Sequence, residues 1–176
     1  MDLFQIYRTP ADLDDMIMCS DGECLTGLSF IRGSEKTPYS EDSDLPVFRE
    51  TVKWLDTYFS GKIPDLIPAY RVIGLTPFRK EVLEAVASIP YGQTMTYGDI
   101  AEKIAQRRGI PRMSAQAVGQ AVGWNPLCII IPCHRIIGAN GDLTGYGGGL
   151  SNKTALLKLE GNDMSRYHLS NDDRIK

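Results

Sequence analysis

The sequence has no long apolar run and no N-terminal segment of the kind that directs secretion. An apolar run such as Cys128 to Ile131 is far shorter than the ~20 residues that a membrane-spanning helix needs. The N-terminus, MDLFQIYRTPADLDD, is acidic where a signal peptide would carry basic and then apolar residues. We therefore expect no membrane partner and a cytoplasmic location.

Cysteine and histidine are scarce, which weighs against a metal site. The four cysteines form two pairs, Cys19 with Cys24 and Cys128 with Cys133, each five residues apart, and only two histidines are present. Paired zinc ligands usually lie closer together in sequence. Cys19 and Cys24 flank a turn-like tetrapeptide and could face each other across a hairpin, but in a reducing compartment we expect them to act as small hydrophobic side chains. No metal and no cofactor is predicted.

Positive charge is in short supply overall, because the net charge is −3. The charge is unevenly distributed, however. Residues 1–75 carry 7 Lys/Arg against 13 Asp/Glu, a net charge of −6, whereas residues 76–176 carry 12 against 9, a net charge of +3. This asymmetry indicates an acidic N-terminal part and a C-terminal part that is able to contact phosphates.

The composition, 43% hydrophobic and 23% charged, is typical of a soluble globular protein, and 176 residues allow one large domain or two small ones. The first part of the chain predicts short strands at Phe4–Arg8, Met16–Cys19 and Leu25–Ile31. A loop over 33–46, rich in Ser, Pro and acidic residues, precedes an amphipathic helix from Val47 to Phe59. We assign residues 1–75 to an N-terminal α/β supporting domain.

The pattern becomes helical after Gly74. Thr76, Thr96 and Ser114 are suitable N-cap residues for helices over 78–89, 97–107 and 115–123. The last two helices, joined by a short basic turn, predict a helix-turn-helix. The last helix consists mostly of small residues, which fits either entry into a groove or close packing against another helix, and the pattern leaves both open. We assign residues 76–163 to a second domain and residues 164–176 to a tail.

The stretch Ile131-Pro132-Cys133-His134-Arg135 carries the strongest chemical signal. An apolar strand is predicted to run into Pro132, which would hold Cys133 at the end of a rigid element. His134 follows at once and could accept the thiol proton. Glu160 ends a helix predicted over 153–159, where a carboxylate opposes the helix dipole, so we expect it to have a specific partner, with His134 as the candidate.

Four glycines surround Tyr146 in the downstream segment Asp142–Leu150, where the backbone could approach a ligand closely. A flexible loop is the alternative interpretation. A phosphate-binding loop is disfavoured, because no Lys-Ser/Thr follows at the required spacing.

The segment from Thr76 to Gly161, about half of the chain, resembles the methylated-DNA–protein-cysteine methyltransferases, also called O6-alkylguanine-DNA alkyltransferases. The resemblance rests on four motifs in order: TPFRKEVLEAVASIPYGQTMTYGDIA, AVGQAVGWNP, IPCHR and GDLTGYGGGLSNKTALLKLEG. It implies an α+β fold, in which a small N-terminal domain with a short antiparallel sheet and a helix precedes a mostly helical domain containing a helix-turn-helix. It also implies DNA repair by stoichiometric, irreversible transfer of the alkyl group from O6-methylguanine, and from O4-methylthymine, to Cys133.

The resemblance further implies a role for each matched residue. Cys133 would accept the alkyl group, His134 would take the thiol proton through a water, Glu160 would orient the imidazole, Tyr97 would donate to the base, and Asn125 would tie the recognition helix to the active-site turn. The substrate pocket would be formed by Val122, Tyr146, Gly147 and Gly148. The partner would be duplex DNA containing O6-alkylguanine, bound through its minor groove, with the base flipped out. Independently of the resemblance, a monomer is the default expectation. The DNA contacts would be Arg107, Arg108, Arg112, Ser114, Ala115, Gln116 and Arg135.

The sequence departs from the family pattern at two points. Gln116 stands where many members carry an arginine that fills the gap left by the flipped base. No histidine is present in the N-terminal region, so the zinc site of some members is not expected. Three alternative functions remain: a non-catalytic relative, which would lack the cysteine; a helix-turn-helix regulator, which would not need Cys133, His134 and Glu160 together; and a cysteine hydrolase, which would turn over repeatedly.

Overall fold

The computed structural model describes residues 3–10, 12–32 and 44–169. The chain forms two compact units. The first unit contains Met1–Gly74 and Pro126–Ile130, and the second contains Leu75–Asn125 and Ile131–Lys176. Within the described ranges, no helix is both long and apolar enough to span a membrane.

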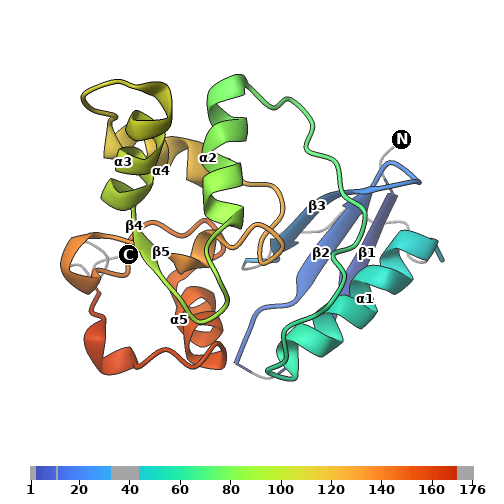
Figure 1. Ribbon diagram of the computed structural model, residues 1–176. Coiled ribbons are helices and arrows are strands. Elements are labelled where there is room, and N and C mark those ends of the chain that lie inside the picture. The colour runs from blue at the N-terminus through green and yellow to red at the C-terminus, as the bar shows by residue number, and fades with distance from the viewer. Residues whose placement is uncertain (1–2, 11, 33–43, 170–176) are drawn as a thin grey trace. The chain divides into compact units, whose positions relative to one another are not determined.

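The first unit is a three-stranded antiparallel sheet with one helix (Figure 1). The strands β1 (Leu3–Tyr7), β2 (Met16–Ser20) and β3 (Leu25–Phe30) pair in that order, and α1 (Pro46–Phe59) packs against β2. Burial alternates along β2, because successive side chains of a strand point to opposite faces. The predicted sheet and helix are confirmed. The predicted loop lies mostly outside the described residues, which resume at 44.

Cys19 and Cys24 do not face each other across the β2–β3 hairpin, although their spacing in the sequence allowed that arrangement. Cys19 lies opposite Gly27, because the register shifts at Cys19/Ser20 and places Ser20 opposite Leu25. A side chain at Gly27 would approach the Cys19 sulfur to 3.2 Å, so the small residue at this position leaves room for the thiol. None of the four cysteines forms a disulfide.

The strand predicted before Pro132 is not formed, which is a correction to the sequence analysis. The Cys128 amide donates to the Leu28 carbonyl of β3 at 2.8 Å, but Ile130 then donates back to Cys128 at 2.8 Å. Ile129 has φ of 70°, a left-handed conformation that is rare for a β-branched residue. The residues are buried as predicted, but the backbone turns tightly instead of extending.

The second unit is mainly helical. It contains α2 (Pro77–Ala87), α3 (Tyr97–Arg108), α4 (Ala115–Gly123) and α5 (Leu150–Leu159). The two-residue strands β4 (Met95–Thr96) and β5 (Ile136–Ile137) pair in parallel. Short 3-10 turns span Cys133–Arg135, Ala139–Gly141 and Met164–Arg166.

Local signals explain where these helices begin. The Thr76 hydroxyl accepts from Arg79 N, Thr96 forms a capping box with Asp99, and the Ser114 hydroxyl accepts from Ala117 N, as predicted. The helices α2, α3 and α4 pack on one another around buried aliphatic side chains. The first part of the predicted tail also belongs to this unit, because His168 exchanges backbone hydrogen bonds with Gly141 and Leu143. Residues 170–176 lie outside the described part of the chain.

Candidate active site around Cys133

Cys133 is the first residue of the 3-10 turn that follows Pro132, and its side chain is buried. The Asn125 amide donates to the Ile131 carbonyl at 2.8 Å and to the Cys133 sulfur at 3.1 Å. A donor aimed at sulfur favours the thiolate over the thiol. Because Asn125 lies two residues after the last residue of α4, it ties the end of that helix to the turn that holds the thiol.

His134 and Glu160 form a fully buried pair, with Nε2 and Oε1 2.8 Å apart. Burial lowers the pKa of His134, and Arg135 and Lys153 lower it further, against the opposing effect of Glu160. The imidazole is therefore neutral at neutral pH. With an ionised Glu160 accepting from Nε2, the basic lone pair is on Nδ1, and the imidazole is able to accept a proton there.

Three other donors hold the Glu160 carboxylate. Arg135 donates from Nη2 to Oε1 at 2.8 Å and from Nε to Oε2 at 2.9 Å, and the Gly92 amide donates to Oε2 at 3.0 Å. Burial alone would raise the pKa of Glu160, but the hydrogen bonds from His134 and Arg135 outweigh burial and lower the pKa to about 2. Gly92 has φ of +76°, and a side chain there would lie 2.9 Å from the Glu160 carbonyl, so this contact requires glycine.

The structure corrects the assignment of Arg135 as a DNA contact. Its side chain is buried, and besides holding Glu160 it donates from Nη1 to the Ile89 carbonyl at 2.7 Å. The guanidinium also lies over the Tyr91 ring, 5.7 Å from its centroid. A buried carboxylate needs a charged partner, and Arg135 serves this interior role.

Lys153 is a buried site residue that the sequence analysis missed. Its ammonium donates to the Ile136 carbonyl at 2.6 Å and to the Thr144 carbonyl at 3.0 Å. Burial lowers the pKa of Lys153 to about 8, while the negative charges of Cys133 and Asp142 oppose this decrease. Because lysine is rarely buried, the sequence pattern gives Lys153 only as the first residue of an ordinary helix. The only sequence signal for a role in the site was that Lys153 lies close to the glycine-rich loop. The helix α5 begins at Leu150, directly after that loop and three residues before Lys153.

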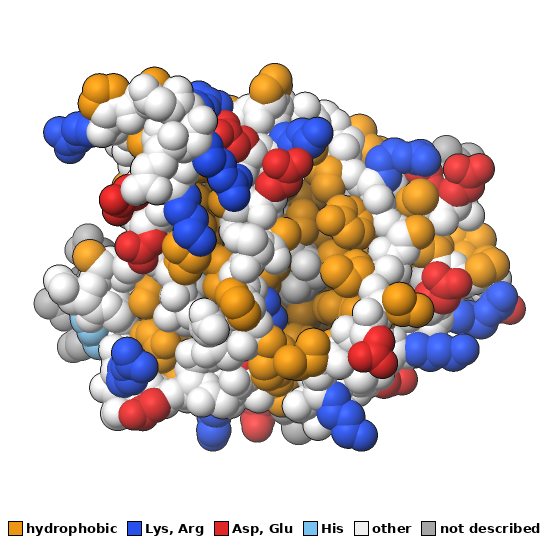
Figure 2. Space-filling model, viewed as in Figure 1, with side chains coloured by type: hydrophobic (Ala, Val, Ile, Leu, Met, Phe, Trp, Pro, Cys, Tyr) orange, Lys and Arg blue, Asp and Glu red, His pale blue; other side chains and the backbone are white. Residues whose placement is uncertain are grey.

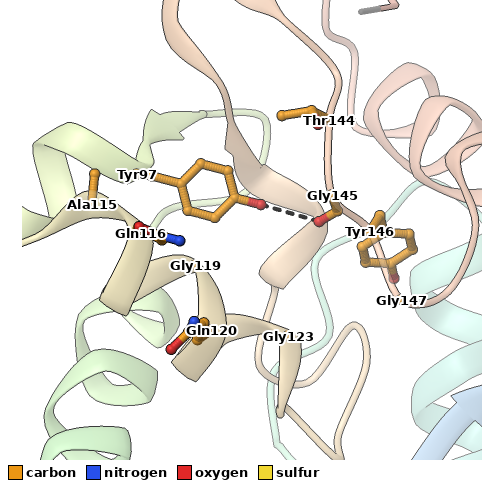
Figure 3. A pocket seen from close by; sticks show the side chains of 10 residues that line it. All are labelled: Tyr97, Ala115, Gln116, Gly119, Gln120, Gly123, Thr144, Gly145, Tyr146 and Gly147. Atoms are coloured by element: carbon orange, nitrogen blue, oxygen red, sulfur yellow. Dashed lines mark hydrogen bonds between the residues drawn. The ribbon is translucent and has the colours of Figure 1, made fainter. Parts of the chain in front are cut away.

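A cavity of about 690 Å³ opens between α3, α4 and the glycine-rich loop (Figure 3). The Tyr97 hydroxyl donates across it to the Gly145 carbonyl at 3.1 Å. Burial and the charge of Cys133 raise the pKa of Tyr97 to about 12, so the hydroxyl stays a donor at neutral pH. The lining residues are Tyr97, Ala115, Gln116, Gly119, Gln120, Gly123, Thr144, Gly145, Tyr146 and Gly147.

Of the four residues that were predicted to form the substrate pocket, two line the cavity and two do not. Tyr146 and Gly147 line the cavity, whereas Val122 and Gly148 are buried and are not among its lining residues. Gly148 instead accepts a hydrogen bond from Asn152 at 2.7 Å. Close packing of α4 is therefore confirmed, since one of its faces packs on α2 and α3, while another face lines the cavity.

The predicted DNA contacts near α4 lie at the surface. Ser114, Ala115, Gln116, Arg107 and Arg112 are exposed. Arg108 is paired with Glu81 at 2.7 Å and lies over the Phe78 ring, which reduces the charge it offers to a partner. Figure 2 shows basic side chains over the region of α2 and α3, interspersed with acidic ones.

Comparison with known proteins identifies the family. The family model described as "6-O-methylguanine DNA methyltransferase, DNA binding domain" matches residues 77–162. Together with the fold and the buried cysteine, this match defines a DNA-binding transferase. The chain is 42% identical to a methylated-DNA–protein-cysteine methyltransferase of Methanosarcina acetivorans, over 90% of this chain and 97% of the relative. The chain belongs to the methylated-DNA–protein-cysteine methyltransferase family.

Solved structures agree with this membership. A crystal structure of the Mycobacterium tuberculosis O6-methylguanine methyltransferase matches with a TM-score of 0.74 and 37% identity, over 96% of each chain. A crystal structure of Mycobacterium tuberculosis OGT in complex with DNA matches with a TM-score of 0.73 and 37% identity, over 93% of this chain and 94% of that one.

Proposed function

We propose that this protein repairs duplex DNA by moving the alkyl group of O6-alkylguanine onto the sulfur of Cys133, once per molecule. The observation that carries the proposal is the site around the thiol: the Asn125 amide 3.1 Å from the sulfur, next to a fully buried His134–Glu160 pair. Membership in a family whose relatives are named for transfer to a protein cysteine supports the same chemistry. O4-methylthymine carries an equivalent alkyl ether and is a second substrate.

The reaction begins with removal of the thiol proton. His134 takes it at Nδ1 through a water, and Glu160, held ionised by Arg135, stabilises the imidazolium. The thiolate sulfur then attacks the alkyl carbon, so that a sulfur–carbon bond forms as the carbon–O6 bond breaks. The guanine anion that leaves takes up a proton from water and becomes ordinary guanine, and the imidazolium releases the thiol proton to water, so no proton is gained or lost overall. The thioether product cannot be hydrolysed at this site, which ends the protein's activity.

Tyr97 and the glycine-rich loop would receive the departing base. Charge develops on the guanine as its bond to the alkyl carbon breaks, and a hydroxyl that remains protonated can donate to ring nitrogen N3. To do so, Tyr97 exchanges its Gly145 acceptor for the base. The Gly147 amide would face the guanine oxygen.

The helix α4 would enter the minor groove and the damaged base would be flipped into the site. The small cavity-lining residues Ala115, Gly119 and Gly123 allow close approach of the backbone. Gln116, in the first turn, would fill the gap and bond to the unpaired cytosine. We assign DNA binding and transfer to residues 76–163, a supporting role to residues 1–75, and a monomer as the active form.

Intact-mass measurement after mixing with duplex DNA that contains one O6-methylguanine tests the proposal. We expect one methyl group per protein molecule, located at Cys133 by peptide mapping, and no transfer to Cys133→Ala. Methyl groups on Cys19, Cys24 or Cys128 of the unaltered protein would refute the assignment. Repeated turnover with an unmodified protein would instead indicate a hydrolase, and binding without transfer a non-catalytic relative or a regulator.

A further inference from the structure

The cavity face of α4 carries two glutamines among small residues. Gln116 and Gln120 both line the cavity and are exposed, and the other α4 residues on this face are Ala115, Gly119 and Gly123. Figure 3 shows both glutamine side chains on the helix segment opposite Tyr97 and Gly145. Neither amide forms a hydrogen bond with another described residue. These two amides are therefore available to a ligand that lies along α4.

Their spacing along the helix axis corresponds to between one and two base-pair steps. Four residues of an α-helix rise by ~6 Å and bring side chains to the same face. Successive base pairs are ~3.4 Å apart. With Gln116 at the flipped nucleotide, as the proposed function has it, the amide of Gln120 lies one or two base pairs further along the groove. An alanine or glycine at 120 would offer no polar group there.

We propose that Gln120 reads the minor-groove edge of a base pair one or two steps from the damaged guanine and makes repair depend on the neighbouring sequence. This inference rests on the proposed function, in particular on entry of α4 into the minor groove. A G·C pair offers the guanine 2-amino donor next to the N3 acceptor, whereas an A·T pair offers acceptors only. The Gln120 amide accepts from the 2-amino group and donates to N3, so it makes two hydrogen bonds with G·C and one with A·T.

Base analogues test this atom by atom. Duplexes carry one O6-methylguanine, and one neighbouring pair at a time is G·C, A·T, inosine·C or 2,6-diaminopurine·T, at the first and second positions on either side. Inosine removes only the 2-amino group of guanine, and diaminopurine adds that group to adenine. At one position we expect faster single-turnover methyl transfer with G·C and diaminopurine·T than with A·T and inosine·C, by about five-fold or more.

Two variants separate Gln120 from its neighbour. Gln120→Ala, which is compatible with an exposed helix position, removes the hydrogen bonds to both kinds of pair, so the rates with G·C and A·T should become equal and their ratio one. Gln116→Ala is the matched control, because it should slow transfer on all duplexes and leave the ratio as it is in the unaltered protein.

Three results would overturn the inference: equal rates on all duplexes, a ratio that survives in Gln120→Ala, or inosine·C behaving like G·C, which would indicate reading from the major groove. Failure of the proposed function is distinguishable, because then no duplex would yield methyl on Cys133.

Discussion

The two compact units bury different kinds of polar side chain. In the described part of the first unit these are Ser20 and Thr51. Each hydroxyl donates to a carbonyl four residues away in sequence, Ser20 to Cys24 at 2.8 Å and Thr51 to Val47 at 2.7 Å. Neutral groups with local acceptors cost little to bury. The ion pairs of this unit, such as Arg49 with Asp44, lie at the surface.

The second unit instead buries ionisable groups that are far apart in sequence. Among the described residues of this unit, the buried polar side chains are His134, Arg135, Asn152, Lys153 and Glu160. Burying an ion costs several kcal/mol unless good geometry and further hydrogen bonds compensate. The second unit buries ionisable side chains near the Cys133 thiol despite this free-energy cost, whereas the described part of the first unit buries only uncharged polar side chains. The difference indicates that these charges are arranged for chemistry and that the first unit is built for packing.

The largest effect on stability should come from removing the buried charge. Glu160→Gln leaves Arg135 without its anionic partner in the interior, and we expect the free energy of unfolding to fall by about 3 kcal/mol or more. Asp44→Asn breaks an exposed ion pair in the first unit and should cost less than about 1 kcal/mol. Urea unfolding of both variants measures the difference. Equal losses would mean that the buried network contributes no more than a surface pair.

The pH dependence of stability should identify the same network. The folded pKa of Glu160, about 2, lies below its ordinary value of 4.5, so its stabilising contribution is present above pH 4.5 and is lost as the pH falls towards 2. The pKa of His134 is also lowered by burial, so the unfolded chain gains a proton first and stability declines as the pH falls below 6.5.

Unfolding free energies measured from pH 7 to pH 3 test this prediction. Below pH 4.5 the slope for the unaltered protein should be steeper than the slope for Glu160→Gln. Parallel curves over that range would show that Glu160 has an ordinary pKa in the folded protein.

Much of this arrangement follows from short-range patterns in the sequence. Thr76, Thr96 and Ser114 cap helices where predicted, because a capping hydroxyl acts within three residues of its own position. The contact between His134 and Glu160 was also foreseen, since a carboxylate at a helix C-terminus needs a compensating partner. A single sequence reveals signals that act over a few residues, such as helix caps, and charged groups that need a compensating partner, such as a carboxylate at a helix C-terminus.

The misplaced residues depend on contacts distant in sequence. Arg135 was predicted to contact DNA, because nothing in its neighbours reveals that Glu160, 25 residues on, lies beside it in the interior. Lys153 was missed for the same reason, since its acceptors are carbonyls of other segments. The turn at Ile129 contradicts the strand preference of isoleucine, and only packing can impose such a backbone.

Two glycines test whether backbone strain matters more near the site. Gly92 and Gly61 have φ of +76° and +80°, so alanine at either position should cost about 1 to 2 kcal/mol. Only at Gly92 would the added carbon meet another atom, the Glu160 carbonyl at 2.9 Å, whereas nothing lies within 4 Å at Gly61. We expect Gly92→Ala also to slow methyl transfer by ~10-fold or more, because it displaces Glu160, and Gly61→Ala to leave the transfer rate unchanged. Single-turnover rates on one duplex compare them, and equal rates would remove Gly92 from the positioning network.

The smallest expected effect concerns the exposed arginines of the two units. Arg112 lies in the basic turn before α4, and Arg49 lies on α1 in the acidic first unit. A phosphate contact releases about one counterion, so Arg112→Ala should weaken binding to undamaged duplex and reduce the slope of log affinity against log salt by about 1. Arg108→Ala should have less effect, because Glu81 already neutralises part of its charge. Arg49→Ala should change neither quantity. Fluorescence anisotropy over a salt series measures all three variants, and an unchanged slope for Arg112→Ala would make the basic turn a solvated surface, not a DNA contact.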